Sequence, residues 1–280
     1  MFCDINFATK AGLVHNEDAV YADPDLLIVM DGASGLNGIH LTPAPTDACW
    51  LAGETVSRLA DRLKRPENSI PQALADTAAE LKAQMFSYGY QDDPFAFPSG
   101  SLMLAREAGD RIELFSLGDC TALAAFHDDR SVLHFHDDAV TRLDGMVLSG
   151  AAELAREKGI SVADALPHFH GMLVGNRMQR NKEGGYWIFE PAGLGIHHGQ
   201  SLLLPKAEVR SLALMSDGFY DIVEQEDGPT HRQLLEWLET APADELIRQL
   251  FAQLEKDPQL NRLPRFKTKD DATVAFARVC

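Results

Sequence analysis

The sequence predicts an α+β fold, because strand-like segments and helix-like segments occur in separate blocks. Four strands are expected in close succession, at residues 101–106, 111–117, 121–126 and 131–136. Connections this short indicate antiparallel hairpins, since a parallel pair needs a crossover of a dozen residues or more. Segments with the spacing of amphipathic helices precede and follow this block.

The N-terminal part predicts a strand, a turn, a second strand and then two helices. Residues 26–30 form a continuous apolar run, which is typical of a strand buried on both faces. Apolar residues then recur at helical spacing over residues 49–63, with Thr46 or Asp47 as the N-cap. A second helix is expected to begin near Ser69. Its apolar stripe comprises Leu74, Ala78, Leu81 and Met85.

The C-terminal part predicts a strand at 211–215, helices at 231–238 and 244–254, and a last strand at 272–279. Residues 137–200 are rich in glycine, histidine and charge, and only one helix is expected there, at about 151–158. A long irregular insertion in a compact domain is typical of a lid or binding loop. Since no repeat or linker divides the chain, we expect one domain over residues 1–280, with a variable lid or insert at about 137–200.

Composition excludes several classes of function. The chain has 280 residues, of which 45% are hydrophobic and 24% charged, as in an ordinary globular protein. Its net charge of −17 argues against nucleic-acid binding and against anionic membrane surfaces. The four cysteines form no CxxC pair, and no apolar run is long enough to cross a membrane. We therefore expect reduced cysteines and a cytoplasmic protein.

Three aspartates share one local form, in which the residue stands at the end of an apolar strand next to glycine. They are Asp31 in VMDG, Asp119 in SLGD and Asp217 in MSDG. The acidic pairs Glu17-Asp18 and Asp270-Asp271 also flank strands. A single Asp-Gly is most often a plain turn. Several carboxylates gathered at strand ends would repel one another, however, unless hard cations such as Mg²⁺ or Mn²⁺ bound between them.

In this order and spacing, the motifs resemble those of the metal-dependent protein Ser/Thr phosphatases called protein phosphatase 2C, and more closely the bacterial members. The matching segments are NEDA at 16–19, VMDGASG at 29–35, SGS at 99–101, SLGDC at 116–120, LMSDGFYD at 214–221 and DDATVAF at 270–276. The resemblance implies a four-layer sandwich, in which two antiparallel β-sheets are flanked by helices. It also implies two or three divalent metal ions, Mn²⁺ or Mg²⁺, at one end of the sheets.

The resemblance also implies roles for individual residues. Asp31 is expected to bridge two metals, with the Gly32 carbonyl binding one of them, and Asp217 and Asp270 complete the catalytic core. Glu17 and Asp18 would bind metal or its water, and Asp119 would hold a further metal. Thr273 sets the register that selects Asp270 rather than Asp271, while Asp221 is expected to be structural and to close a turn. The implied reaction is in-line attack on phosphorus by water activated between two metals.

The sequence departs from the family pattern at the phosphate-binding position. Many members place an arginine a few residues before the Glu-Asp pair, but residues 12–16 here read GLVHN. His15 is the candidate substrate-binding residue in that stretch, and Arg177, Arg180 or Lys182 could supply the cation from the insert. Arginine is otherwise preferred for bidentate phosphate contacts.

Two function classes remain open on the sequence alone. The first is a phosphatase that acts on phosphoserine and phosphothreonine in proteins, or on a small phosphorylated molecule. The alternative is a weak or inactive relative that binds phosphoproteins or partners. The expected partner is a phosphorylated protein, with no nucleic acid, no membrane and no particular oligomeric state indicated. The pairs His134-x-His136 and His168-x-His170 have a spacing that can bind zinc, although a solvated strand face is the commoner meaning.

Overall fold

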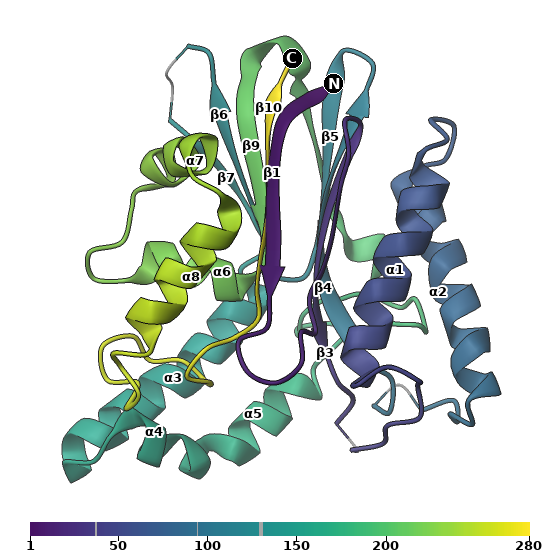
Figure 1. Ribbon diagram of the computed structural model, residues 1–280. Coiled ribbons are helices and arrows are strands. Elements are labelled where there is room, and N and C mark those ends of the chain that lie inside the picture. The colour runs from purple at the N-terminus through teal and green to yellow at the C-terminus, as the bar shows by residue number, and fades with distance from the viewer. Residues whose placement is uncertain (37, 94, 129–130) are drawn as a thin grey trace.

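The computed structural model describes residues 1–36, 38–93, 95–128 and 131–280. It confirms the α+β class and the four-layer sandwich, because two five-stranded sheets lie face to face with helices on both outer sides (Figure 1). One sheet has the order β1-β10-β9-β6-β7 and the other β2-β3-β4-β5-β8, and every pairing is antiparallel. The strands are β1 Phe2–Lys10, β2 Ala19–Ala22, β3 Leu26–Ala33, β4 Ser99–Ala108, β5 Arg111–Leu117, β6 Thr121–Phe126, β7 Leu133–Phe135, β8 Gln200–Pro205, β9 Val209–Met215 and β10 Ala272–Val279.

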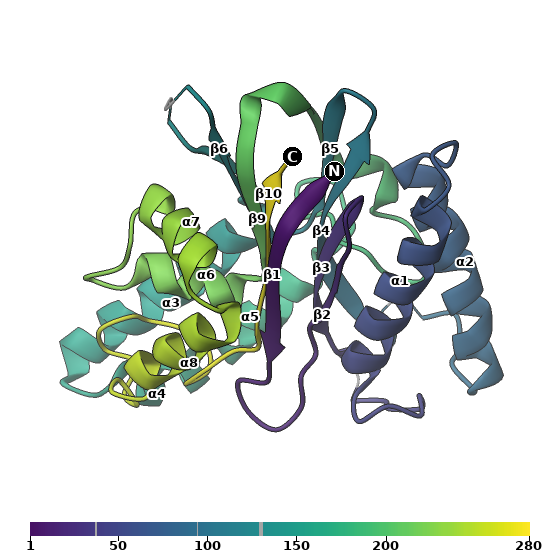
Figure 2. The ribbon, with the colours of Figure 1, turned by 45° about the horizontal axis from the view of Figure 1, so that its top comes forward.

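Helices cover the outer faces of both sheets. Figure 2 shows α1 and α2 beside the sheet that contains β3, and α7 and α8 beside the sheet that contains β1. Apolar side chains fill the space between the sheets and the space under each helical layer. The helices are α1 Asp47–Leu63, α2 Ile70–Ser87, α3 Ala139–Lys158, α4 Val162–Ala165, α5 His170–Arg177, α6 Asp217–Glu224, α7 His231–Thr240 and α8 Ala243–Leu254, with 3₁₀ turns at Leu166–Phe169, Ile196–His198 and Lys206–Glu208.

The elements predicted from apolar periodicity are confirmed. The run at residues 26–30 is the fully buried part of β3. The Thr46 hydroxyl accepts a hydrogen bond from the Cys49 amide and caps α1, and Ser69 caps α2 in the same way through Gln72. These caps satisfy amide groups that have no partner within the helix. The predicted helices near 231–238 and 244–254 are α7 and α8.

Residues 137–200 are more helical than predicted. The expected helix at 151–158 begins already at Ala139, and α4 and α5 follow it. Gly145 and Gly150 weaken the apolar pattern along α3, which buries only Val147, Ala151 and Ala155. This set is too small to give a strong periodic signal, although the three residues lie four apart on one face. In Figure 1, α3, α4 and α5 lie at the end of the molecule opposite the chain termini.

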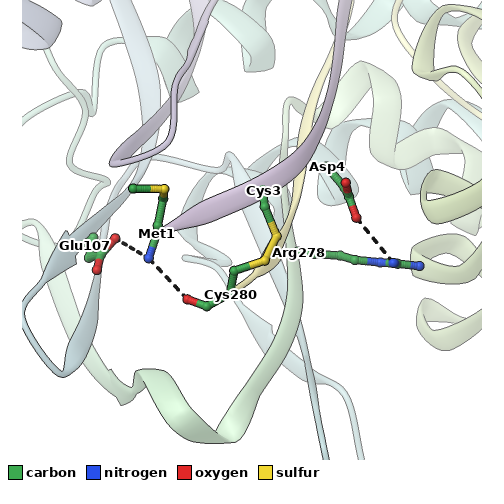
Figure 3. Close-up of a disulfide and its surroundings, with 6 residues drawn as sticks. All are labelled: Met1, Cys3, Asp4, Glu107, Arg278 and Cys280. Atoms are coloured by element: carbon green, nitrogen blue, oxygen red, sulfur yellow. Dashed lines mark hydrogen bonds and ion pairs between the residues drawn. A yellow bond between two sulfur atoms is a disulfide. The ribbon is translucent and has the colours of Figure 1, made fainter.

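The expectation of reduced cysteines is wrong for Cys3 and Cys280, which form a disulfide between β1 and the residue after β10 (Figure 3). The antiparallel pairing of β1 with β10 brings the two ends of the chain together, with a Cα–Cα distance of 6.2 Å. That distance lies within the range that a disulfide spans. Cys49 and Cys120 are free.

Among the described residues, no helix is long and apolar enough to span a bilayer. The cytoplasmic location stays a prediction.

Candidate metal centre and active site

The predicted acids gather at the end of the sheets that lies away from the termini. β1 ends at Lys10, opposite Ala272 at the start of β10, and β9 ends at Met215, opposite Val274. Asp217 and Asp270 stand beside these strand ends. In the facing sheet Asp31 is paired with Ser101, whose hydroxyl donates to the carboxylate of Asp119. The two sheets therefore present their acids toward a common point.

Hydrogen bonds tie together three of the motifs that are far apart in sequence. The carboxylate of Asp271 accepts from the amides of Gly12 at 2.8 Å and Glu17 at 2.6 Å, so it fixes the loop that carries Glu17 and Asp18. Ser216 and Thr273 are joined twice: the Ser216 amide donates to the Thr273 carbonyl, and the Thr273 amide donates to the Ser216 hydroxyl. The acids are thus held on a hydrogen-bonded frame of strand ends.

Both carboxylate oxygens of Asp271 are engaged with those backbone amides. Asp270 instead lines the adjacent cavity and hydrogen-bonds to Lys267 at 2.7 Å. The two neighbours therefore have different contacts: Asp271 holds backbone amides, and Asp270 lies at the cavity. Asp270 is the residue that the register set by Thr273 selects as the candidate ligand.

Burial and mutual repulsion raise the pKa values of these aspartates. Burial raises the pKa of Asp31 well above its ordinary value, and the nearby charges of Asp217, Asp18, Asp119 and Asp270 add to the shift. Burial likewise raises the pKa of Asp217 to about 7, with Asp119 and Asp270 contributing. The site therefore carries more buried negative charge than its protein surroundings offset.

Asp18 is a further buried acid whose charge is not fully offset by its surroundings. Burial raises its pKa to about 8, and the charges of Asp271 and Asp217 add to the effect, while the nearby Thr273 and Ser216 side chains offset part of it. Both carboxylate oxygens of Asp18 are buried without a hydrogen-bond partner in the described part of the chain. An unpaired buried carboxylate is costly unless a cation reaches it.

Two glycines are required by close approach or by backbone conformation. A β-carbon at Gly32 would lie 2.5 Å from the carbonyl oxygen of Glu17, so glycine lets β3 pass against the Glu17-Asp18 loop. Gly118 has φ of +92°, and a β-carbon there would collide with the Ser101 hydroxyl that Asp119 accepts from. Burial raises the pKa of Asp119 above its ordinary value.

A cavity of about 430 Å³ opens beside these acids. Asp119, Asp217 and Asp270 line it, whereas Asp31, Asp18, Glu17, Gly32 and His15 are not among its described lining residues. Its remaining wall includes residues of α3, α6 and the α8–β10 loop: Thr141, Asp144, Gly145, Leu148, Tyr220, Asp221, Glu224, Pro264, Arg265, Phe266 and Lys267.

Sequence reasoning missed Asp144 and misjudged Asp221. The SDGxxD segment was expected to be a turn closed by Asp221, but Asp217 begins helix α6, and Asp221 lies one helical turn further on, at the cavity. Burial raises the pKa of Asp221 well above its ordinary value, and burial raises that of Asp144 to about 6. Thr141, Asp144 and Leu148 recur at helical spacing, the one sequence signal that α3 lines a cavity with this face.

Glu17 and His15 lie at the margin of the site. The Ser34 hydroxyl donates to Glu17 at 3.3 Å, and the Glu17 amide is the one held by Asp271. His15 is exposed, in the same loop as the well-exposed Leu13 and Val14. The predicted contact of His15 with substrate stays a prediction.

The basic candidates of the insert have separate surroundings. Arg180 is buried, pairs with Glu190 at 3.5 Å and donates to Ser99 at 2.9 Å, so it braces the start of β4. Lys182 lies over the Phe95 ring at 5.2 Å. Arg177 is exposed at the end of α5, yet its charge acts on Asp119 and opposes the rise in the pKa of that residue. Of the three, Arg177 is therefore the one that electrostatics places near the acids.

The donor set fits divalent cations in its chemistry. Carboxylate oxygens are the ligands that Mg²⁺ and Mn²⁺ prefer, and their buried charge here is offset only in part by Arg177 and by Lys267, which pairs with Asp270. Within the described ranges, no three acidic, histidine or cysteine side chains already form a cage for an ion. The histidine pairs whose spacing can bind zinc form no such cage either within these ranges. His134 and His136 stack on each other at 4.0 Å, and His168 and His170 lie in the helical insert rather than on a strand.

Comparison with known proteins agrees with this geometry. No curated protein sequence matches the chain. The serine/threonine phosphatase Stp1 from Staphylococcus aureus is similar in structure, with a TM-score of 0.57 and 16% identity over 100% of this chain and 96% of that one. The Mycobacterium tuberculosis phosphatase PstP/Ppp gives a TM-score of 0.56 and 18% identity over 100% and 99% of the two chains.

A structure of the PstP catalytic domain in complex with two manganese ions is also similar, with a TM-score of 0.54 and 19% identity over 99% and 98% of the two chains. At these identities the likeness shows the fold. The family follows from the sequence itself, which matches the model for protein phosphatase 2C over residues 12–257. This match covers most of the chain and most of the acidic motifs. The chain therefore belongs to the protein phosphatase 2C family.

Proposed function

We propose that this protein is a phosphatase that uses Mn²⁺ or Mg²⁺ to hydrolyse phosphoserine and phosphothreonine in proteins. The observation that carries the proposal is the group of buried carboxylates Asp18, Asp31, Asp119 and Asp217, whose raised pKa values reflect buried negative charge that neighbouring cations offset only in part. A binding module has no need of such a group. The manganese-bound PstP domain supports the choice of metal.

Asp31, Asp217 and Asp270 would be the central ligands, with Asp18, Glu17, the Gly32 carbonyl and Asp119 completing two or three sites. Because the described residues form no preformed cage for an ion, we expect these side chains to rotate when ions bind. Metal binding would also displace protons from Asp31 and Asp217, because burial raises the pKa values of both carboxyl groups. Bound divalent ions would lower the pKa of a water and offset charge on the phosphoryl oxygens.

The chain's own residues support water as the nucleophile. Cys120 lies next to Asp119, but burial raises the pKa of its thiol well above the ordinary value, and the surrounding carboxylates add to the rise. A buried thiol of this kind is a poor nucleophile. It is fully buried and is not among the described lining residues of the cavity. We therefore assign hydrolysis without a covalent phosphoenzyme.

The whole of residues 1–280 would act as one domain, with the insert at 137–200 as a wall of the active site. Asp144 and Thr141 place α3 on the cavity, so substrate has to pass this helix. The insert is thus the element best placed to select among phosphorylated proteins.

The test is hydrolysis of phosphoserine, phosphothreonine and phosphotyrosine peptides by EDTA-treated protein to which Mg²⁺ or Mn²⁺ is returned. We expect metal-dependent release of phosphate from the first two peptides, abolished in Asp31→Asn. Metal binding without turnover on any phosphopeptide or on p-nitrophenyl phosphate would instead support the binding-only alternative. Turnover that persists in EDTA would contradict the proposal.

A further inference from the structure

We infer that Lys267, in the loop between α8 and β10, is the side chain that binds the phosphate of the substrate. The inference rests on the proposed function and assigns phosphate binding to a residue that is not among the candidates predicted from the sequence, which are His15, Arg177, Arg180 and Lys182. It starts from the charge of the cavity. Six acids line the cavity, namely Asp119, Asp144, Asp217, Asp221, Glu224 and Asp270, so a phosphate group that enters meets strong repulsion unless cations lie within reach.

Two lining residues carry a fixed positive charge, and only one of them has hydrogen-bond donors to offer. All five N–H groups of Arg265 are engaged, with the carbonyl oxygens of Thr268, Leu263, Leu254 and Asp257 and with the Asp257 carboxylate. Arg265 is also buried. It therefore clamps the loop and has no donor left for a ligand.

Lys267 is different in each respect. Its ammonium group makes one hydrogen bond to a described residue, to Asp270 at 2.7 Å, and an ammonium carries three donors. Its side chain is 46% exposed and lines the cavity. A lysine in this position is a mobile point charge that a phosphate oxygen can reach.

The location of Lys267 couples phosphate to the metal site. Its neighbour Arg265 holds the loop to Asp257 at 3.0 Å, which limits where the ammonium can go. Its partner Asp270 is a proposed metal ligand. When Asp270 turns to a metal, Lys267 loses its one described partner beside the position that the phosphate would take. Phosphate can then replace Asp270 as the partner of the ammonium.

The position-matched control is Lys269, two residues further along the same loop. Lys269 pairs with Glu255 at 2.6 Å, lies over the Phe251 ring at 5.4 Å and is not among the lining residues of the cavity. Lys267→Met and Lys269→Met remove the same charge from the same loop. Lys267→Arg keeps the charge and serves as the rescue variant.

The experiment measures the affinity of the manganese-loaded protein for inorganic phosphate by calorimetry, the affinity for Mn²⁺, and KM and kcat on a phosphopeptide. We expect Lys267→Met to weaken phosphate binding and raise KM by about tenfold to hundredfold, the effect of one charge-assisted hydrogen bond, with a smaller change in kcat. Lys267→Arg should restore most of the affinity, and Lys269→Met should match wild type. Binding of Mn²⁺ to Lys267→Met should be unchanged or tighter, because a cation beside Asp270 has been removed.

Unchanged phosphate binding and KM in Lys267→Met would overturn the inference and leave Lys267 as a counter-ion of Asp270. The same result in Lys267→Met and Lys269→Met would overturn it as well, since it would show a general charge effect. A wild-type protein without metal-dependent turnover would refute the proposed function separately. The phosphate titration would still decide the role of Lys267 in that case.

Discussion

The two ends of the sandwich differ in how their carboxylates are surrounded. At the end with the termini, the Met1 ammonium and the Lys206 ammonium both contact the carboxylate of Glu107, and the Cys3–Cys280 disulfide joins the outermost residues (Figure 3). At the other end, buried carboxylates lie close together, and burial and mutual repulsion raise the pKa values of Asp31 and Asp217. The first end is stabilised by ion pairs and a disulfide within the chain, and we propose that cations from solution complete the second.

The largest expected effect separates the two ends by mutation. Asp31→Asn should lower kcat by roughly 10³-fold or more, because the proposed bridging ligand loses its charge. The same change should raise the stability of the metal-free protein, since a buried like charge is removed. Phosphatase kinetics and thermal unfolding in EDTA measure the two effects.

The control for this contrast is Asp4→Asn at the opposite end. Asp4 makes an exposed ion pair with Arg278 at 3.3 Å, and such pairs contribute at most about 1 kcal/mol. Both activity and stability should therefore stay near wild type. Equal losses of activity in Asp4→Asn and Asp31→Asn would remove the distinction between the two ends.

The second effect concerns the disulfide and the opposite end alone. Reduction, or Cys3→Ser, should lower the free energy of unfolding by about 2–5 kcal/mol, because the bond joins residues 277 apart in sequence. The kcat should not change, since the acids lie at the far end of the sheets. Urea unfolding with and without reductant measures the free energy of unfolding, and a phosphatase assay measures kcat. Cys49→Ser should keep the wild-type sensitivity to reductant.

A smaller effect is expected at the frame of the site. Asp271→Ala leaves the amides of Gly12 and Glu17 without their acceptor, so the loop that carries Asp18 should loosen. Mn²⁺ binding should weaken about tenfold to hundredfold, the usual effect of removing a residue that supports a metal ligand. Asp271→Asn keeps one acceptor and should fall between Asp271→Ala and wild type in a calorimetric titration. An alanine variant that binds Mn²⁺ as well as wild type would show that the frame is dispensable.

A further effect is the dependence of metal-free stability on pH. Asp18 and Asp217 have folded-state pKa values of about 8 and about 7, above the ordinary aspartate value. Above pH 4 the unfolded chain loses these protons first, so the folded state binds more protons and its stability falls as pH rises, until the pH passes about 8. The Tm in EDTA should therefore fall over this range, and Mn²⁺ should raise it most at the high end. A Tm in EDTA that rises from pH 5 to 8 would contradict this assignment.

Local sequence patterns were sufficient to predict many of the strands and helices. The strand at residues 26–30 and the helices capped by Thr46 and Ser69 follow from apolar periodicity and capping, which act within a few residues. The four-layer arrangement came from the family resemblance. The long helix α3 was underestimated, because its buried face is three small or branched residues interrupted by glycine.

Only those site residues that stand at the ends of strands could be predicted from the sequence. Asp31, Asp119 and Asp217 each stand in a recognisable strand–turn context, and the structure brings them together. Asp144 and Lys267 come to the same cavity from α3 and from the α8–β10 loop, and that proximity depends on tertiary packing. The disulfide was missed for the same reason, since its cysteines meet only when β1 pairs with β10.

The most direct test of the central claim is a calorimetric titration of EDTA-treated protein with Mn²⁺ at pH 7, in two buffers of different ionisation enthalpy. The buried acids should take up at least two ions and release protons on binding, because ligands with raised pKa values must be deprotonated to bind a metal. In Asp31→Asn the affinity should fall sharply. Failure of the wild type to bind Mn²⁺, or binding that releases no protons and is unaffected by Asp31→Asn, would contradict the assignment of this end of the sandwich as a metal centre.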